Sequence, residues 1–476
     1  MALHVAILAA LATVFVGWAL RQIYPWPYLY DEADYMYAAT QSAAANYLDS
    51  PSQPLAGFIR MGLREGRDPA RRGSLSEFIR ASGDVNFYRH WHGPLYFFWL
   101  KAMSYQQAAA PAVRTWFIVF PLATMLVIYF GALWIFAPPV DLPAAVLSAT
   151  LFLWSYPVSR SNEIAPHQMY ALWYVLVLIL LAKLTTTPLA ATGGDATGAR
   201  RYWYAAVAFT AVAFATMEIS FTLVAVLLIL AWRERKTRQL DKAWVVRSLL
   251  LFAGVATALW PMGLLKLSVI KSYLFMAYLA VFRSNAWGDL TLAEAWRSRL
   301  LESPAEWLLV AAALILFRPR RDRAAFPALL YSLITLAAMF RVNSDTPRYM
   351  FPYLAGLDML AGFVLAERIA GLRAPWRLAA VAGLAVVLGI DTARQVAAHP
   401  VNPDLRPQAV LDAVRENRFN DRPLLVPLGD FPMLHYYFPR ATLHSYTTPQ
   451  PPENAEEIAL LPGNPVQWRI PEAPGR

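Results

Sequence analysis

The chain has 476 residues, of which 58% are hydrophobic and only 16% charged, and its mean hydropathy is +0.37. Soluble domains usually carry about 25% charged residues, so this composition excludes an ordinary soluble protein and predicts a membrane protein. The net charge of +10 does not indicate nucleic-acid binding, because the basic residues cluster between apolar runs, and the absence of cysteine excludes disulfides and thiolate metal sites.

The first apolar run, residues 5–20, predicts a membrane-spanning helix. No Lys/Arg cluster precedes it and no small-residue cleavage site follows it, so we expect a retained helix rather than a signal peptide. Further apolar runs lie at residues 93–108, 113–136, 142–158, 164–184, 203–217, 220–232, 248–265, 304–318, 325–343, 349–368 and 376–392. Together they predict an all-α polytopic membrane protein with about 11 or 12 transmembrane helices.

Basic clusters between these runs predict the orientation of the chain. They lie at residues 200–201, 233–238, 318–323 and 373–377, and the positive-inside rule places all four in the cytoplasm. Residues 21–92, 266–303 and the tail after Asp391 are then outside. Helix parity fails by one, so we expect that either 93–108 or 220–232 does not cross the membrane fully.

The chain is expected to have two parts. Residues 1–391 would form the transmembrane module, including a polar outer loop at 21–92 with helices on the membrane surface. Residues 392–476 are Pro-rich and would form a small extracytoplasmic region, with a helix at 406–417, a strand at 424–428 and a helical turn at 430–437. Such an α/β unit is too small to fold well alone.

Acidic residues gather at the start of a predicted helix in the outer loop. Asp31, Glu32 and Asp34 open a segment whose apolar and small residues recur at helical spacing. Acidic side chains at this position can simply cap the helix and interact with its dipole. A carboxylate at the membrane boundary is also desolvated, which raises its proton affinity toward that of a useful base.

Two histidines precede the second apolar run. His90 and His92 stand with Arg89 just before Pro94, a residue suited to the first turn of a helix. The spacing of the two histidines supplies no third metal ligand, so anchoring at the membrane interface is the alternative to a role in substrate binding.

A third group of ionisable residues opens the run at 164–184. Arg160, Glu163 and His167 lie on the predicted outer side, and Glu163 and His167 share a helix face. The pattern fits contact with an acceptor or sugar, and it fits a helix cap equally well. Glu218 lies between two short apolar runs and predicts a turn.

Three short motifs, in this order, resemble the GT-C superfamily of membrane glycosyltransferases, in the branch of protein O-mannosyltransferases and lipid A aminoarabinose transferases. They are Asp31-Glu32 after the first helix, the sequence HGPLY at residues 92–96, and the sequence PRYMFPY at residues 347–353. The family pattern often has proline where Gly93 stands. The resemblance extends over residues 5–390 in its architecture, although each motif is short.

This resemblance implies a sugar donor carried on a polyprenyl phosphate and an active site facing the periplasm or exterior of a bacterial inner membrane. The family assigns the base that deprotonates the acceptor hydroxyl to the Asp of the Asp-Glu pair, here Asp31, with Glu32 as a supporting neighbour and Asp34 as a weaker alternative.

The departing phosphate requires cations, and a partly dry site strengthens their effect. The candidate substrate-binding residues are Arg60, Arg64, Arg67, Arg89, His90, His92, Lys266, Lys271, Arg348 and Tyr349. Contact with lipid headgroups is the favoured alternative for the two lysines, and interfacial snorkelling is the alternative for Arg348.

The mechanism needs no metal, so we expect no cofactor; a related branch uses a divalent ion, which Asp31 with Glu32 or Asp34 would be suited to hold. The expected partners are the lipid-linked donor, a lipid, glycan or protein acceptor, and membrane lipids. A lipid or polysaccharide transporter is the main alternative and predicts charged residues within the helix bundle. A non-catalytic membrane scaffold is a third hypothesis, and the sequence identifies neither the sugar nor the acceptor.

Overall fold

The computed structural model describes residues 1–25, 27–28, 30–40, 54–67, 93–103, 110–160, 163–187, 196–234, 242–261, 273–274, 277–279, 281–282, 290–344, 346–401, 406–416, 423–426, 434, 436–438, 442–445, 456–457, 459–461 and 467–469. The chain forms two compact units. The helical unit consists of Met1–Ile23, Thr115–Leu259 and Leu279–Pro400, and the loop-and-tail unit consists of Tyr24–Arg114, Trp260–Tyr278 and Val401–Arg476.

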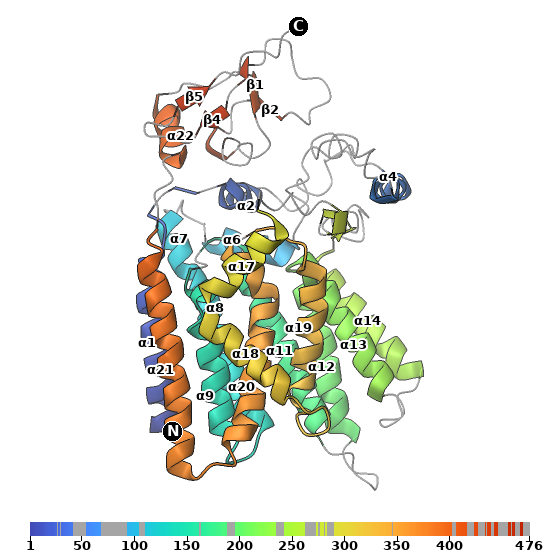
Figure 1. Ribbon diagram of the computed structural model, residues 1–476. Coiled ribbons are helices and arrows are strands. Elements are labelled where there is room, and N and C mark those ends of the chain that lie inside the picture. Colours follow the sequence, from blue (N-terminus) through green and yellow to red (C-terminus); the bar gives the residue numbers. More distant parts are fainter. Residues whose placement is uncertain are drawn as a thin grey trace. The chain divides into compact units, whose positions relative to one another are not determined.

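The helical unit contains the long apolar helices (Figure 1). They are α1 (Ala2–Arg21), α8 (Val119–Ile135), α9 (Asp141–Leu153), α10 (Tyr156–Arg160), α11 (Pro166–Thr186), α12 (Ala196–Phe214), α13 (Phe221–Glu234), α14 (Lys242–Leu259), α17 (Leu292–Glu302), α18 (Pro304–Leu316), α19 (Phe326–Met339), α20 (Phe351–Ile369) and α21 (Ala374–Ala398), with 3-10 turns η3 (Glu218–Ser220) and η5 (Pro347–Met350). Glu218 does lie in a turn, between α12 and α13, as the sequence predicts.

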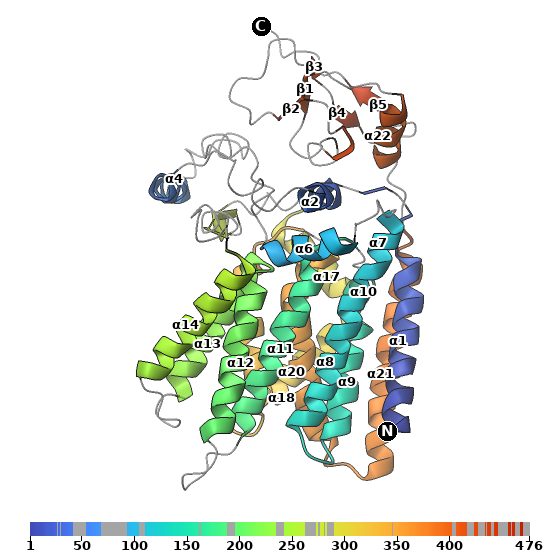
Figure 2. The ribbon, with the colours of Figure 1, turned by 180° about the vertical axis from the view of Figure 1, so that it is seen from behind.

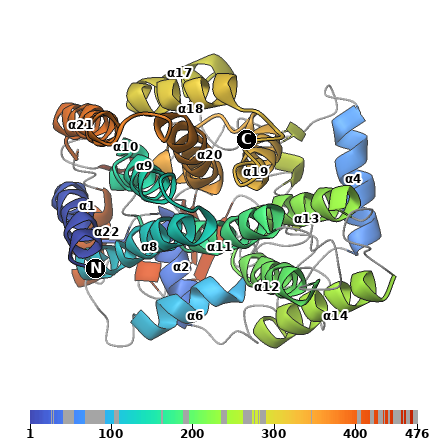
Figure 3. The same ribbon diagram turned by 90° about the horizontal axis from the view of Figure 1, so that it is seen from below.

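Helix α20 is the centre of this unit. Of the most apolar window in Pro347–Ile369, 94% is buried inside the protein, and α20 packs against α9, α11, α18 and α19 (Figure 3). By contrast, only 17% of the corresponding windows of α1 and α21 is buried, and these helices lie at the edge of the unit (Figure 2). Exposed apolar faces of this kind suit contact with lipid.

Two tyrosines hold the first turn of α20. The Tyr174 hydroxyl donates to the carbonyl of Phe351 (2.7 Å) and accepts from the amide of Ala355 (3.1 Å), so it is inserted into the backbone ladder of the helix. The Tyr331 hydroxyl donates to the carbonyl of Pro352 at 2.5 Å. The carbonyl of Phe351 and the amide of Ala355 would bond to each other in a regular helix, so the Tyr174 hydroxyl bridges one rung of the ladder.

The closest approach of α20 to a neighbour is at Gly362. A Cβ atom added there would lie 2.6 Å from the amide nitrogen and 2.7 Å from the Cα atom of Ser148 on α9. Small residues at such crossings let helix backbones approach closely in membranes.

We therefore expect Gly362→Ala to destabilise the helical unit by about 1–3 kcal/mol, because the backbone of Ser148 cannot move aside as a flexible side chain would. Gly383→Ala on α21 is the matched control, since nothing lies within 4 Å of its added Cβ. Thermal unfolding of the two variants in one detergent tests this. Equal midpoints for Gly362→Ala and wild type would contradict it.

Among the described residues, five helices are long and apolar enough to cross a membrane. They are Ala2–Arg21, Ala110–Ile135, Pro166–Thr186, Pro347–Ile369 and Ala374–Ala398, and shorter apolar helices lie at Asp141–Leu153, Ala243–Leu259, Pro304–Leu316 and Phe326–Met339. The all-α polytopic class predicted from the sequence is confirmed. The figure of 11 or 12 spans stays a prediction.

The basic clusters and Arg348 lie at opposite ends of α20. Arg321 pairs with Glu367 (3.2 Å) and Arg368 with Asp322 (2.7 Å), which joins the 318–323 cluster to the C-terminal end of this helix. Arg348 directly precedes its N-terminal end, and the 19 residues of α20 rise by about 28 Å. The predicted orientation, in which the clusters are cytoplasmic and Arg348 is outside, stays a prediction.

The loop-and-tail unit contains α2 (Tyr30–Thr40), α4 (Leu55–Arg67), α6 (Pro94–Met103), α22 (Arg406–Arg415) and strands β1 (Pro423–Val426), β2 (Thr442–Ser445), β3 (Glu456–Glu457), β4 (Ala459–Leu461) and β5 (Gln467–Arg469). Helix α7 (Ala110–Phe117) contains the boundary between the units. The 10 residues of α6 rise by about 15 Å, and the expectation that the run 93–108 does not cross the membrane fully stays a prediction.

The tail forms more sheet than its sequence indicates. Strand β1 pairs in parallel with β2 on one side and β3 on the other, with Leu424 opposite Leu443 and Glu456, and β4 pairs antiparallel with β5. The predicted helix and first strand are present as α22 and β1. The predicted boundary between domains at residue 391 stays a prediction.

Candidate active site

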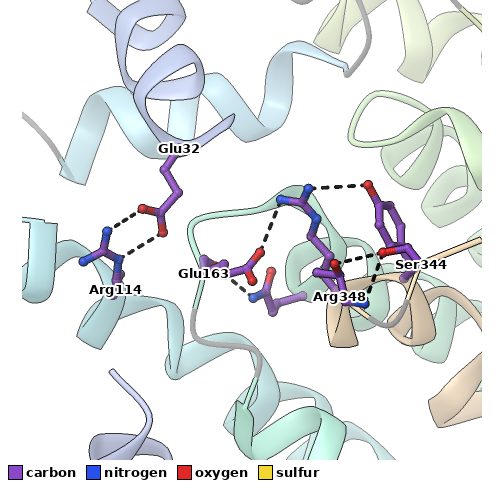
Figure 4. Close-up of polar contacts among 8 residues, drawn as sticks. Glu32, Arg114, Glu163, Ser344 and Arg348 are labelled. Atoms are coloured by element: carbon purple, nitrogen blue, oxygen red, sulfur yellow. Dashed lines mark hydrogen bonds and ion pairs between the residues drawn. The ribbon is translucent and has the colours of Figure 1, made fainter. Parts of the chain in front are cut away.

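The first turn of α2 carries the Asp-Glu pair and is held by a buried ion pair. Glu32 is 4% exposed and receives two hydrogen bonds from Arg114 of α7, from Nε to Oε1 at 3.0 Å and from Nη2 to Oε2 at 2.5 Å (Figure 4). The Arg114 side chain is 0% exposed. A two-point arrangement between guanidinium and carboxylate fixes orientation as well as charge.

Arg114 also binds the chain that leads into α2. Its Nη1 donates to the carbonyl of Tyr24 (2.7 Å) and its Nη2 to the carbonyl of Pro27 (2.9 Å). One side chain therefore fixes both the approach to α2 and its first turn. Because guanidinium donors lie in a rigid planar fork, lysine would not reproduce this set of contacts.

Tyrosines from the tail contact the same approach segment. The Tyr437 hydroxyl donates to the carbonyl of Tyr28 at 3.3 Å, and the rings of Tyr28 and Tyr436 meet edge to face at 5.5 Å. Burial raises the pKa of both the Tyr28 and Tyr437 hydroxyls, and nearby Glu32 adds to this. The Tyr437 hydroxyl therefore stays protonated at neutral pH, as its hydrogen bond to the carbonyl of Tyr28 requires.

Asp31 is the more accessible carboxylate of the pair. Its side chain is partly exposed, whereas that of Glu32 is buried. Asp34 lies on α2 as predicted, although its side chain is outside the part that the structure describes. The structure thus separates the two acids by environment, since the Asp31 side chain is partly exposed and Glu32 is buried against Arg114.

Helix α6, which begins within the HGPLY motif, packs against α2. Pro94 begins α6, as the sequence predicts, and the ring of Tyr35 meets those of Tyr96 (5.5 Å) and Phe97 (6.3 Å). The HGPLY motif thereby supplies a packing surface for the helix that carries Asp31.

In the helical unit, Arg348 lies in a polar cluster at the N-terminal end of α20. Its Nη1 donates to Glu163 Oε2 at 3.2 Å, and its guanidinium lies 5.2 Å from the ring centre of Tyr349 (Figure 4). His167 meets the ring of Tyr349 edge to face at 5.7 Å. Four predicted residues are therefore brought together here from segments far apart in the chain.

A second arginine pair lies beside this cluster. Arg160 of α10 pairs with Glu302 of α17 at 3.0 Å, and α10 packs against η5, which carries Arg348. The half-buried Arg348 is thus surrounded by fixed contacts rather than extending freely into the lipid interface, which argues against simple snorkelling.

The remaining predicted site residues are either exposed on α4 or outside the described part of the chain. Arg60 and Arg64 are exposed on α4, which buries Phe58 and Met61 on its opposite side. The side chain of Arg67, and residues Arg89, His90, His92, Lys266 and Lys271, lie outside the described part of the chain. Within the described part, no group of three His, Asp or Glu residues is arranged to hold a metal ion.

The solved structures similar to this chain are membrane transferases. No family model and no curated protein sequence matches it. ArnT from Cupriavidus metallidurans bound to undecaprenyl phosphate is 14% identical, with 93% of this chain and 85% of that chain covered and a TM-score of 0.52. AglB from Archaeoglobus fulgidus, in complex with an inhibitory peptide and a dolichol-phosphate, is 13% identical with a TM-score of 0.56.

The alignment with AglB covers 94% of this chain but only 64% of AglB. The oligosaccharyltransferase of the same archaeon has also been solved in complex with Zn and sulfate, at 12% identity, a TM-score of 0.50, and coverage of 87% and 62%. At these identities the likeness establishes the fold alone, which this chain shares with ArnT and AglB.

Proposed function

We propose that this protein is an inverting glycosyltransferase, which moves a hexose or pentose from a polyprenyl-phosphate carrier to an acceptor hydroxyl on the extracytoplasmic side of a bacterial inner membrane. The observation that carries the proposal is an accessible Asp31 beside the buried Glu32–Arg114 ion pair, on a chain with the GT-C fold.

In the proposed reaction, Asp31 accepts the proton of the acceptor hydroxyl. The hydroxyl oxygen forms a bond to the anomeric carbon from the side opposite the carrier. The bond from that carbon to the phosphate oxygen breaks, and its electron pair leaves on the phosphate. Configuration at the anomeric carbon is therefore inverted, and the products are the glycosylated acceptor and free polyprenyl phosphate.

The choice of a lipid-linked donor rests on two observations. ArnT and AglB, which share the fold, have been solved with undecaprenyl phosphate and dolichol-phosphate. This sequence also has no glycine-rich phosphate loop of the kind that binds nucleotides. The acceptor is proposed as a lipid, glycan or protein.

With Asp31 as the base and Arg348 as the group that binds the phosphate, the proposed reaction needs no metal. A divalent ion remains an alternative, which the zinc complex of the archaeal oligosaccharyltransferase suggests. Treating the purified protein with a chelator and then adding zinc, magnesium or manganese separates the two mechanisms.

The deciding experiment is a transfer assay with purified protein in nanodiscs and a panel of polyprenyl-phosphate sugars. Release of polyprenyl phosphate that depends on an acceptor would support the proposal, and the accepted donor would identify the sugar. Movement of intact lipid across the bilayer without release would favour the transporter.

The transporter alternative has one observation in its favour. Glu306 of α18 and Asp358 of α20 are 2% and 0% exposed, and their carboxylate oxygens have no hydrogen-bond partner among the described residues. Intramembrane carboxyls of this kind occur in proton pathways. The assay above therefore includes Glu306→Gln and Asp358→Asn, which a transporter would not tolerate and an enzyme with its base at Asp31 would.

We assign binding of the carrier phosphate to Arg348. Arg348→Ala is expected to weaken binding of undecaprenyl phosphate by about 10- to 100-fold, since a charge-assisted hydrogen bond contributes about 1.5–3 kcal/mol. Arg348→Lys retains the charge and should retain part of the affinity. Arg297→Ala, an exposed arginine on α17, is the control. Unchanged affinity in Arg348→Ala would refute the assignment.

A further inference from the structure

Helix α17 carries more charged residues than the apolar helix α18 that follows it. It begins with a cap in which two residues bond to each other's backbone. The Thr291 hydroxyl accepts from the amide of Glu294 (3.2 Å), and the Glu294 carboxylate accepts from the amide of Thr291 (2.8 Å). These bonds lower the pKa of Glu294, so the cap is intact at neutral pH. A reciprocal cap of this kind defines where a short helix begins.

One face of α17 binds the backbone that leads to Arg348. Nη2 of Arg299 donates to the carbonyls of Val342 (2.6 Å) and Ser344 (2.8 Å), and Arg299 is 1% exposed. One turn earlier, Nε1 of Trp296 donates to the carbonyl of Phe340 at 3.0 Å. Three alternate carbonyls of this backbone segment are therefore fixed by two neighbouring side chains of one helix.

The contacts continue from Ser344 to Arg348. The Ser344 hydroxyl donates to Oγ1 of Thr346 (2.9 Å) and accepts from the amide of Thr346 (3.2 Å). Pro347 follows directly and begins η5, whose second residue is Arg348. Any displacement of the Ser344 carbonyl would therefore be transmitted to the start of η5 (Figure 4).

The C-terminal end of α17 contacts α10, which packs beside Arg348 in η5. Glu302 pairs with Arg160 of α10, and α10 packs against η5. Among the described residues, Arg299 itself makes no ion pair with a carboxylate, and its guanidinium donates to the backbone carbonyls of Val342 and Ser344. The buried guanidinium of Arg299 fixes the position of these carbonyls, because moving them would leave its positive charge without hydrogen-bond acceptors.

We propose that α17 is a clamp for the segment 340–350, and that Arg299 is a positioning residue that sets the guanidinium of Arg348 for the phosphate of the carrier lipid. The inference rests on the proposed role of Arg348. It assigns to α17 a part in donor binding that neither its composition nor its sequence spacing indicates.

The test is the affinity of the purified full chain for undecaprenyl phosphate, measured with thermal stability on the same samples. Arg299→Met is expected to weaken binding about tenfold. The double variant Arg299→Met/Arg348→Ala should bind no more than about twofold more weakly than Arg348→Ala alone, because Arg299 acts through Arg348. Arg299→Lys should be intermediate, and Arg297→Met is the control from the same helix.

Additive losses in the double variant, or a lower unfolding midpoint for Arg299→Met with unchanged affinity, would show a purely structural role and overturn the inference. If Arg299→Met does not fold, Trp296→Phe replaces it, since this variant keeps an aromatic side chain and removes the indole N–H that donates to the carbonyl of Phe340. Weaker binding in Arg348→Ala but normal binding in both α17 variants would overturn the clamp alone. No binding by wild type would overturn the proposed function with it.

Discussion

Replacing Asp31 with asparagine is expected to lower the turnover number for sugar transfer by about 100- to 10,000-fold while leaving the protein folded. Asparagine has nearly the same shape but cannot accept the proton of the acceptor hydroxyl. The side chain of Asp31 is partly exposed, and asparagine fits the same space, so we expect the variant to stay folded.

Asp412→Asn is the matched control for this variant. Asp412 is an exposed carboxylate in the same unit, paired with Arg415 at 3.0 Å, and the chemical change is identical. The measurement is the initial rate of sugar transfer at saturating donor for each variant. The unfolding midpoint of each variant is measured alongside it. A turnover number for Asp31→Asn within a few-fold of wild type would exclude Asp31 as the base.

The helices of this fold could be predicted from the sequence because their signals are local. Apolar runs and prolines mark α11, α18 and α20, and Pro94 begins α6 as expected. The strands of the tail were predicted only in part, since β2 to β5 are 2–4 residues long, and β2 and β3 pair with β1 rather than with each other. Short strands are determined by their partners more than by their own residues.

For the candidate site, too, the sequence predicted individual residues but not their contacts. Asp31, Glu32, Glu163 and Arg348 were recognised as ionisable residues at the ends of apolar runs, but their partners were not. Glu163 and Arg348 are 185 residues apart, and Glu32 and Arg114 are 82 apart. Arg114 was missed because it stands at the start of an apolar run, where a single arginine is an ordinary interfacial residue. A lone charge entering such a run is the signal that would have found it.

Replacing Arg114 with methionine is expected to cost about 3–5 kcal/mol of stability in the loop-and-tail unit, because it leaves the buried carboxylate of Glu32 without its counter-ion. The carbonyls of Tyr24 and Pro27 lose their donors at the same time. The turn that carries Asp31 would then be free to move, so sugar transfer should fall well beyond the loss explained by unfolded protein.

The double variant Arg114→Met/Glu32→Leu separates stability from positioning. Replacing both partners of a buried ion pair by apolar residues is often neutral for stability, so the double variant should regain most of the unfolding midpoint lost in Arg114→Met. It should not regain transfer activity, because the approach to α2 still lacks its donor. Arg415→Met is the control, since its exposed pair with Asp412 contributes only about 0–1 kcal/mol.

Recovery of both the midpoint and the activity in the double variant would mean that Arg114 only neutralises Glu32. Recovery of the midpoint alone would mean that the Glu32–Arg114 pair also positions Asp31, which agrees with the four hydrogen bonds that Arg114 donates. Arg114→Lys distinguishes charge from geometry further. Lysine keeps the positive charge beside Glu32 but lacks the planar fork, so it should preserve stability better than activity.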